Sequence, residues 1–288
     1  MIVIIGAIIV IASVLGGFTM AGGHVASLMH PSEVVTIGGS ALGALVLMSP
    51  KKVIIDLFKA ALGSLKGSPY GKKAYEDLLK ALYELFLLGR RNGMIALEEH
   101  VMNPDSSAIF TKYPSFSKNH HAMEFLCNGL KPIIDGKIKP DQLKVLLDTE
   151  LESMELEHHA PIGVLTKTAD AMPGFGIVAA VLGIVITMGA ISGPIEEIGH
   201  KVGAALVGTF LGILISYGFL NPLAVNMEFM AASEHAYLKT VSLAVAGFAN
   251  GMAPIMAVEV ARRGLSSDVK PGAAEMEEML KSLNSPGK

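Results

Sequence analysis

The 288-residue chain has no tryptophan, only one cysteine and few charged residues. The lone cysteine, Cys127, excludes an internal disulfide and argues against a cysteine-ligated zinc site. Charged residues form 17% of the chain and the net charge is −3, so the composition gives no support for a nucleic-acid partner. Hydrophobic residues form 51% and the mean hydropathy is +0.50, which is too apolar for an ordinary soluble enzyme. These absences favour a protein of the lipid bilayer.

Four apolar runs are candidate membrane spans, at 1–20, 33–49, 171–192 and 201–222. Neither 171–195 nor 202–227 contains Asp, Glu, Lys or Arg, and each exceeds the length of about 20 residues that a helix needs to cross the hydrocarbon core. Only a short link with Glu196 and Glu197 separates them, so these two runs predict an antiparallel transmembrane hairpin. No Lys or Arg precedes the first run, which favours a retained span over a cleaved signal.

We expect no ionisable residue in the interior of a span: the nearest are Asp170, before the third span, and Lys201, at the start of the fourth. Ion transporters normally carry such a residue within a span. Four spans without one either carry no ion or depend on a carboxylate that a partner protein supplies. A passive membrane anchor for a soluble domain is the simplest alternative.

The rest of the chain predicts a helical domain at 50–168 and a helical tail at 223–288. Within them, helices are expected at 70–91, 94–101, 116–130 and 140–158. The uncharged segment 240–258 is long enough for a fifth span, but Pro254 and its polar residues favour a buried helix packed on the domain. From Leu265 the tail is polar and is expected to fray. Lys and Arg flank one side of the spans, which places the domain and both termini in the cytoplasm.

Small residues recur at helical spacing in the last two spans. They are Gly176, Ala180 and Gly183 in the third span, and Ala204, Gly208 and Gly212 in the fourth. Small residues let helices approach closely in lipid, so these faces should pack on protein, either within the chain or on a partner helix. Pro173 and Pro222 lie at the same end of the hairpin, and we expect the helices to break or kink there because proline lacks a backbone donor.

Motifs for enzymatic chemistry are missing. The chain has no HExxH, no GxSxG and no glycine-rich phosphate loop after a strand, so a hydrolase or a nucleotide-driven pump finds no support. Two histidine pairs, at 120–121 and 158–159, are better explained as solvated side chains than as metal ligands. Adjacent residues on a helix point about 100° apart and cannot easily share an ion.

Four charges surround a predicted helix end. Arg90 and Arg91 close the helix at 70–91, Asn92-Gly93 is a typical stop, and Glu98 and Glu99 follow. Charges in this arrangement are usually a solvated surface. They equally suit a docking surface, in which charge complementarity sets register and encounter rate.

Several of these segments resemble the MotA family, the stator subunits of the bacterial flagellar motor. They are Arg90-x-x-Gly93 with Leu97-Glu98, PGFGIVAAVLGIV from Pro173, VGTFLGILISYGF before Pro222, GGFTMAGG after the first span, and YGKKAYEDLLKALYEL. The resemblance covers nearly the whole chain in order. It implies an all-α integral membrane protein with four transmembrane helices in two hairpins, a large helical cytoplasmic domain between spans 2 and 3, and a helical cytoplasmic tail.

The resemblance implies a non-enzymatic stator in the bacterial inner membrane that converts proton flow into torque. Such subunits form a ring, thought to be a pentamer, around the single spans of two MotB-like subunits whose aspartate carries the proton, and no cofactor is expected. Ala180 and Thr209 match positions that line the ion path. Ala180 stands where sodium-driven relatives carry threonine, which favours protons.

The resemblance also assigns roles at the cytoplasmic side. Pro173 and Pro222 match prolines held to couple protonation to movement of the cytoplasmic domain. Arg90 and Glu98 match charges that engage the rotor protein FliG, and which member of each Arg and Glu pair makes contact stays open. The alternative is a TolQ- or ExbB-like energiser of a periplasmic or outer-membrane partner, although those proteins have three spans and a different start.

Overall fold

The computed structural model describes residues 2–284, which are all-helical and contain no strand. The chain divides into two compact units. The spanning unit comprises Met1–Gly67 and Glu157–Met230, and the globular unit comprises Ser68–Leu156 and Ala231–Lys288. Four helical stretches are long and apolar enough to cross a membrane, so the predicted all-α architecture with four spans is confirmed. They are Ile2–Met20, Val25–Met48, Pro140–Gly189 and Ile195–Ala249.

The spanning unit begins with helices that keep much of their apolar surface exposed. Helix α1 (Ile2–Met20) has no buried residue, as expected of a helix whose solvent is lipid or another subunit. A short 3-10 turn, η1 (Val25–Leu28), leads to α2 (Pro31–Met48), which buries one stripe of residues four apart. Helix α3 (Lys51–Ser64) follows α2 after a break at Ser49-Pro50.

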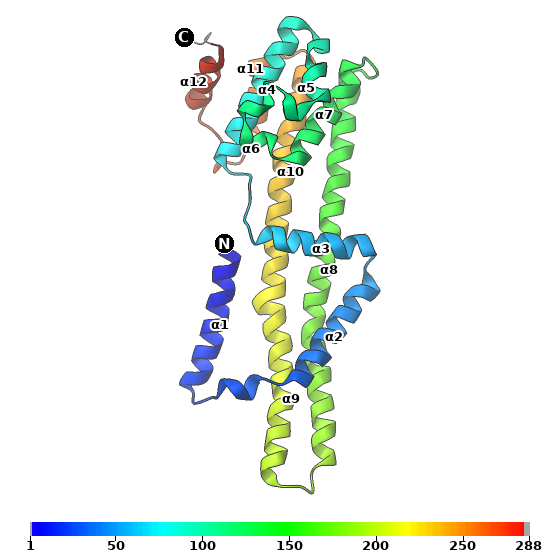
Figure 1. Cartoon of the computed structure of the whole chain (residues 1–288), viewed down its shortest axis with the longest axis vertical. Helices are drawn as coiled ribbons and strands as arrows, with labels where there is room; N and C mark the ends of the chain where they lie inside the picture. Colours follow the sequence, from blue (N-terminus) through cyan, green and yellow to red (C-terminus); the bar gives the residue numbers. More distant parts are fainter. Residues whose placement is uncertain (1, 285–288) are drawn as a thin grey trace. The chain divides into compact units, whose positions relative to one another are not determined.

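Helices α8 (Pro140–Gly189) and α9 (Ile195–Ile215) form the hairpin that the uncharged runs predicted (Figure 1). Of the break or kink expected at Pro173, the break is wrong, because α8 begins at Pro140 and continues through both Pro161 and Pro173. A proline removes one donor from the helix, but close neighbouring helices tolerate that loss within a membrane. The separate helix expected at 140–158 is therefore the first part of this longer one.

The backbone does change at the second proline. Helix α9 ends at Ile215, a π-helical turn η5 (Ser216–Leu220) follows, and α10 (Asn221–Ala249) starts one residue before Pro222. The Asn221 N–H donates to the Ser216 carbonyl, a wider step than the α-helical one. Because the ring of Pro222 would clash with a carbonyl four residues earlier, this wider turn gives the proline room.

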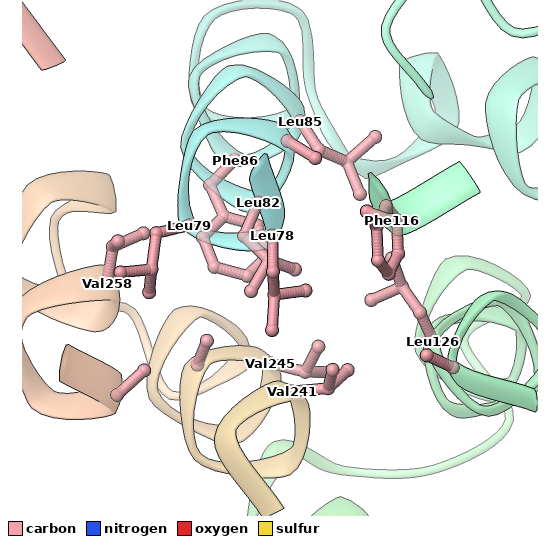
Figure 2. Close-up of a cluster of buried hydrophobic side chains, with 14 of the residues drawn as sticks. Leu78, Leu79, Leu82, Leu85, Phe86, Phe116, Leu126, Val241, Val245 and Val258 are labelled. Carbon is pink, nitrogen blue, oxygen red and sulfur yellow. The ribbon is translucent and has the colours of Figure 1, made fainter. Parts of the chain in front are cut away.

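The globular unit is built on α4 (Lys72–Asn92), whose leucine-rich face is fully buried. Figure 2 shows Leu78, Leu82 and Phe86 of α4 directed toward Val241 and Val245 of α10. The other elements of the unit are η2 (Met94–Leu97), α5 (Glu98–Met102), η3 (Pro104–Ser106), η4 (Phe110–Lys112), α6 (Pro114–Ser117), α7 (His120–Ile134), α11 (Pro254–Arg263) and α12 (Ala273–Asn284). Helix α4 packs against α6, α10, α11 and α12, which come from distant parts of the sequence, so it lies at the centre of the unit's core.

The segment 240–258 lies in this core and is not a fifth span. It is two helices rather than the single helix expected: α10 ends at Ala249, and α11 begins at Pro254 after a turn in which Gly251 has φ 86°. The expectation that the tail frays from Leu265 is also wrong for 273–284. Helix α12 buries Met276 and Leu280 against the core, while 285–288 lie outside the described residues.

Candidate functional site

Glycines bring α8 and α9 into backbone contact inside the spanning unit. A Cβ on Gly176 would lie 2.9 Å from the Gly208 carbonyl oxygen and 3.2 Å from the Thr209 Cα atom. A Cβ on Gly212 would lie 2.6 Å from the Met172 carbonyl oxygen. Spacings below 3 Å cannot hold a side chain, so these residues must stay small for the hairpin to close as it does. Packing within the chain therefore accounts for this part of the small-residue pattern.

Closer to the hairpin turn, the residue of α9 that contacts α8 is one position away from the residue expected from the sequence. A Cβ on Gly183 would lie 2.7 Å from the Cβ of Ala205, which is buried. Ala204, the residue expected on this face, is half-buried, and the three atoms nearest to a Cβ on Gly183 all belong to Ala205. A contacting face that combines i+3 and i+4 steps explains the difference, because strict i+4 spacing drifts around a helix.

The two residues matched to an ion path flank this contact. Thr209 is half-buried beside Gly208, and Ala180 is half-buried beside the buried Ala179. Neither side chain titrates, so neither can take up a proton itself. Thr209 can offer a hydroxyl, and Ala180 adds only a methyl group.

The second candidate span carries a buried acidic side chain, Glu33, which the sequence reading missed. Glu33 in the first turn of α2 is 7% exposed, and its Oε2 atom has no hydrogen-bond partner. The expectation of spans free of ionisable residues is therefore wrong. Glu33 is the first residue of the predicted span 33–49, directly before the charge-free run from Val34, so hydropathy put this carboxyl at the edge of the span.

A hydrogen-bonded group joins the neighbourhoods of the two prolines. Asn221 donates from its side chain to Asp170 at 3.4 Å and to the Ser216 hydroxyl at 3.4 Å. Asp170 precedes Pro173 by one turn, and Asn221 immediately precedes Pro222. Both prolines therefore lie at one level of the hairpin, where the regular helical hydrogen bonding is incomplete on each helix.

In the globular unit, the four charges around the end of α4 are all exposed. Arg90 and Arg91 close α4, and Glu98 and Glu99 open α5, yet none of them forms an ion pair within the described residues. Ile95 between the two pairs is 76% exposed. The turn therefore presents one exposed apolar side chain between two pairs of exposed charges.

A rigid support holds this charged turn, which we define as residues 90–99. Gly93 has φ 84°, a left-handed conformation that glycine adopts without strain, and it ends α4. Leu97 is fully buried, and a Cβ on Gly89 would approach both Leu97 and Phe248 at 3.0–3.1 Å. Phe248 in turn stacks on Phe86 with ring centroids 4.3 Å apart. The charges therefore extend from a well-packed base.

The histidine pairs do not form a metal site. Within residues 2–284 no group of three His, Cys, Asp or Glu side chains is arranged to hold an ion. His121 instead contacts Glu234 at 2.8 Å. Burial raises the pKa of the Cys127 thiol to about 12, so this cysteine is unreactive in the folded unit.

Comparison with known proteins agrees with these features along the whole chain. Residues 4–93 match the motility protein A N-terminal family, and residues 117–235 match the MotA/TolQ/ExbB proton channel family. Motility protein A of Salmonella typhimurium is 37% identical over 286 residues, covering 99% of this chain and 97% of the relative. Motility protein A of Escherichia coli is 36% identical with the same coverage.

Solved structures share the fold. The Campylobacter jejuni protein in "Structure of C. jejuni MotAB" aligns with a TM-score of 0.77 at 20% identity, over 92% of this chain and 96% of that one. The flagellar MotAB stator complex of Bacillus subtilis gives a TM-score of 0.73 at 24% identity, over 89% of this chain and 92% of that one.

The four candidate spans and the match to the proton-channel family define the class of this protein. It is a multi-pass membrane protein of the proton-channel class, and not an enzyme. More narrowly, the chain belongs to the motility protein A (MotA) family of flagellar stator subunits. The resemblance read from the sequence is thus confirmed.

Proposed function

We propose that this chain works with a single-span MotB-like partner as a proton-conducting stator that turns ion flow into torque on the flagellar rotor. The observation that carries the proposal is full-length similarity to motility protein A, at 37% and 36% identity over 99% of this chain. The matching solved complexes are MotAB assemblies, in which a second type of subunit accompanies the MotA chain. A TolQ- or ExbB-like energiser remains the second candidate, but its three-span layout does not fit the two spans that precede the globular unit here.

The proposed assembly is a ring, with five copies as the expected number, around the partner's spans. Large apolar side chains on α1 and on the outer face of α8 are exposed in the single chain, including Ile5, Ile8, Ile177 and Val181. Lipid and neighbouring copies together can cover such faces. The partner's aspartate would carry the proton past Ala180 and Thr209, with alanine at 180 favouring protons over sodium.

The first test is rotation of tethered cells that lack their own stator genes and receive this chain with its neighbouring MotB-like gene. We expect speed to recover in steps and to collapse when a protonophore is added in sodium-free medium. Rotation only with sodium would keep the stator and overturn the proposed ion. A purified complex that never rotates a motor would favour the TolQ-like candidate.

We propose that both termini and the globular unit face the cytoplasm. Helix α3 supports this orientation because Lys51, Lys52 and Lys59 accompany an exposed apolar row of Ile55 and Phe58. An amphipathic helix with lysines suits the anionic surface of the inner leaflet.

Cysteine labelling tests this orientation, and buried Cys127 gives a low background. A membrane-impermeant maleimide should label Ser192→Cys, at the exposed hairpin turn, in intact cells. It should label Ser153→Cys, exposed on α8 in the globular unit, only after permeabilisation. The reverse pattern would invert the proposed topology.

We propose that the charged turn contacts the rotor protein FliG, with Arg90 and Glu98 as the expected contacts. Reversing the charge of Arg90 and Arg91 together places like charges across the interface, and we expect about a five-fold loss of swimming speed. Stator accumulation should not change, because both side chains are exposed and lack ion pairs among residues 2–284.

The matched control reverses Lys131 and Lys139, which are exposed elsewhere on the same unit and change the net charge equally. Normal swimming of that control beside an impaired turn variant would place the effect at residues 90–99. Equal speeds for the two variants would remove the docking assignment.

A further inference from the structure

The buried carboxyl of Glu33 fits into a space that α9 leaves open. A Cβ on Gly208 would lie 2.5 Å from the Glu33 Oε2 atom and 3.1 Å from the Ala179 Cβ atom. Alanine at position 208 would therefore occupy the place of the carboxyl oxygen. Ile37 and Ala41, one and two turns further along α2, continue the same buried stripe.

Helix capping does not explain why the Glu33 carboxyl is buried. Glu33 is three residues after the N-cap of α2, the position from which a glutamate usually reaches back to the N-cap backbone N–H. The Glu33 Oε2 atom has no hydrogen-bond partner, so it does not cap His30, and it lies beside Gly208 of α9 instead. The carboxyl group of Glu33 therefore lies between α2 and α9 and does not cap its own helix.

The surroundings offer no counter-charge among the described residues. Helix α9 presents Gly208 and helix α8 presents Ala179, neither of which titrates. Lys201 of α9 lies about two turns before Gly208 and is paired with Glu197 at 2.8 Å. On α2 itself the titratable neighbour is His30, one turn earlier, and its Nδ1 atom is also buried without a partner.

A buried carboxylate without a partner loses its hydration and gains nothing in return, and taking up a proton removes the buried charge. Gly208 is also adjacent in the chain to Thr209, which the proposed ion path includes. From these observations we infer that Glu33 is a second proton-binding site of the channel, carried by this chain in addition to the partner's aspartate. The inference rests on the proposed function.

The step at this site is a simple proton transfer. The Glu33 carboxylate takes a proton from hydronium, which becomes water, and the neutral carboxylic acid occupies the space beside Gly208. Loss of the same proton to water restores the carboxylate. No oxidant, metal or cofactor takes part.

The test uses the complex of this chain with its MotB-like partner in liposomes, with proton uptake followed by a pH-sensitive dye. Glu33→Gln keeps the size of the side chain and removes the proton site, so we expect proton flux to fall at least about ten-fold. Glu33→Asp should recover part of the flux. Glu196→Gln, which removes an exposed carboxyl at the start of α9, should leave flux unchanged.

Infrared difference spectra across a pH titration provide a readout that does not depend on transport. We expect one protonated-carboxyl band to be lost in Glu33→Gln and retained in Glu196→Gln. Gly208→Ala should displace the carboxyl and shift that band, since the added methyl meets the flexible end of Glu33.

Two outcomes would overturn the inference. One is a Glu33→Gln complex with the flux, pH profile and carboxyl band of the unaltered protein. The other is equal loss of flux and of complex yield in Glu33→Gln and Glu33→Asp, which would make Glu33 structural. If the unaltered complex conducts no protons, the proposed function fails, and the infrared band alone then decides whether Glu33 binds a proton.

Discussion

Replacing Gly212 with alanine should sharply reduce the amount of folded subunit in the membrane. The new methyl group would lie 2.6 Å from the Met172 carbonyl oxygen and 3.0 Å from the Gly176 Cα atom. Both neighbours are backbone atoms of α8, so neither can move aside by changing a rotamer. Overpacking typically costs about 1–3 kcal/mol, and we expect the upper end or more because a whole helix must shift.

Denaturant titration of the purified subunit in detergent micelles measures this loss, together with the amount of protein in membranes. Gly203→Ala is the matched control, since it lies on the same helix and a Cβ there has no neighbour within 4 Å. It should leave stability unchanged or slightly higher, because alanine is the better helix former. Equal stability of Gly212→Ala and Gly203→Ala would mean that α8 and α9 do not pack as described.

The spans could be predicted from sequence because the bilayer imposes a strict rule. Every backbone polar group must be satisfied in lipid, so a long uncharged run has almost no structure available except a helix. The charged turn was also predictable in outline. Asn92-Gly93 signals a helix end, and the positive φ of Gly93 follows from that local chemistry.

Other features depend on contacts that the sequence does not display. Glu33 reads as the residue before an apolar run, and only the gap at Gly208 on a distant helix makes it buried. Ala205 rather than Ala204 faces Gly183 because the exact rotation of α9 is set by packing. Helix α12 looked polar and frayed, yet its buried pair Met276 and Leu280 is enough to hold it on the core.

The continuity of α8 through Pro173 is the most instructive of these differences. Proline removes a backbone donor and clashes with the preceding turn, so helices in soluble proteins usually break or kink at an interior proline. Here the helix persists because α9 packs along it through Gly176 and Gly212. The proline nevertheless leaves the carbonyl of Ala169, a fully buried residue, without its usual helical donor.

Replacing Pro173 with alanine should therefore stop rotation while leaving the complex assembled. Alanine restores the missing N–H donor to the Ala169 carbonyl and removes a helix penalty of about 3 kcal/mol, so α8 becomes stiffer at the level of Asp170 and Asn221. If this level is the joint through which protonation moves the globular unit, a stiffer helix couples poorly. We expect tethered-cell speed below about a tenth of normal, with thermal stability equal or higher.

Pro161→Ala is the matched control for that variant. Pro161 is an interior residue of the same helix and precedes the apolar span. The same gain of one donor there should leave rotation close to normal, because Pro161 is about two and a half turns away from Asp170, to which Asn221 donates. Normal torque from Pro173→Ala would disprove a joint at this proline. Equal loss in both variants would show that α8 needs flexibility along its length rather than at Pro173.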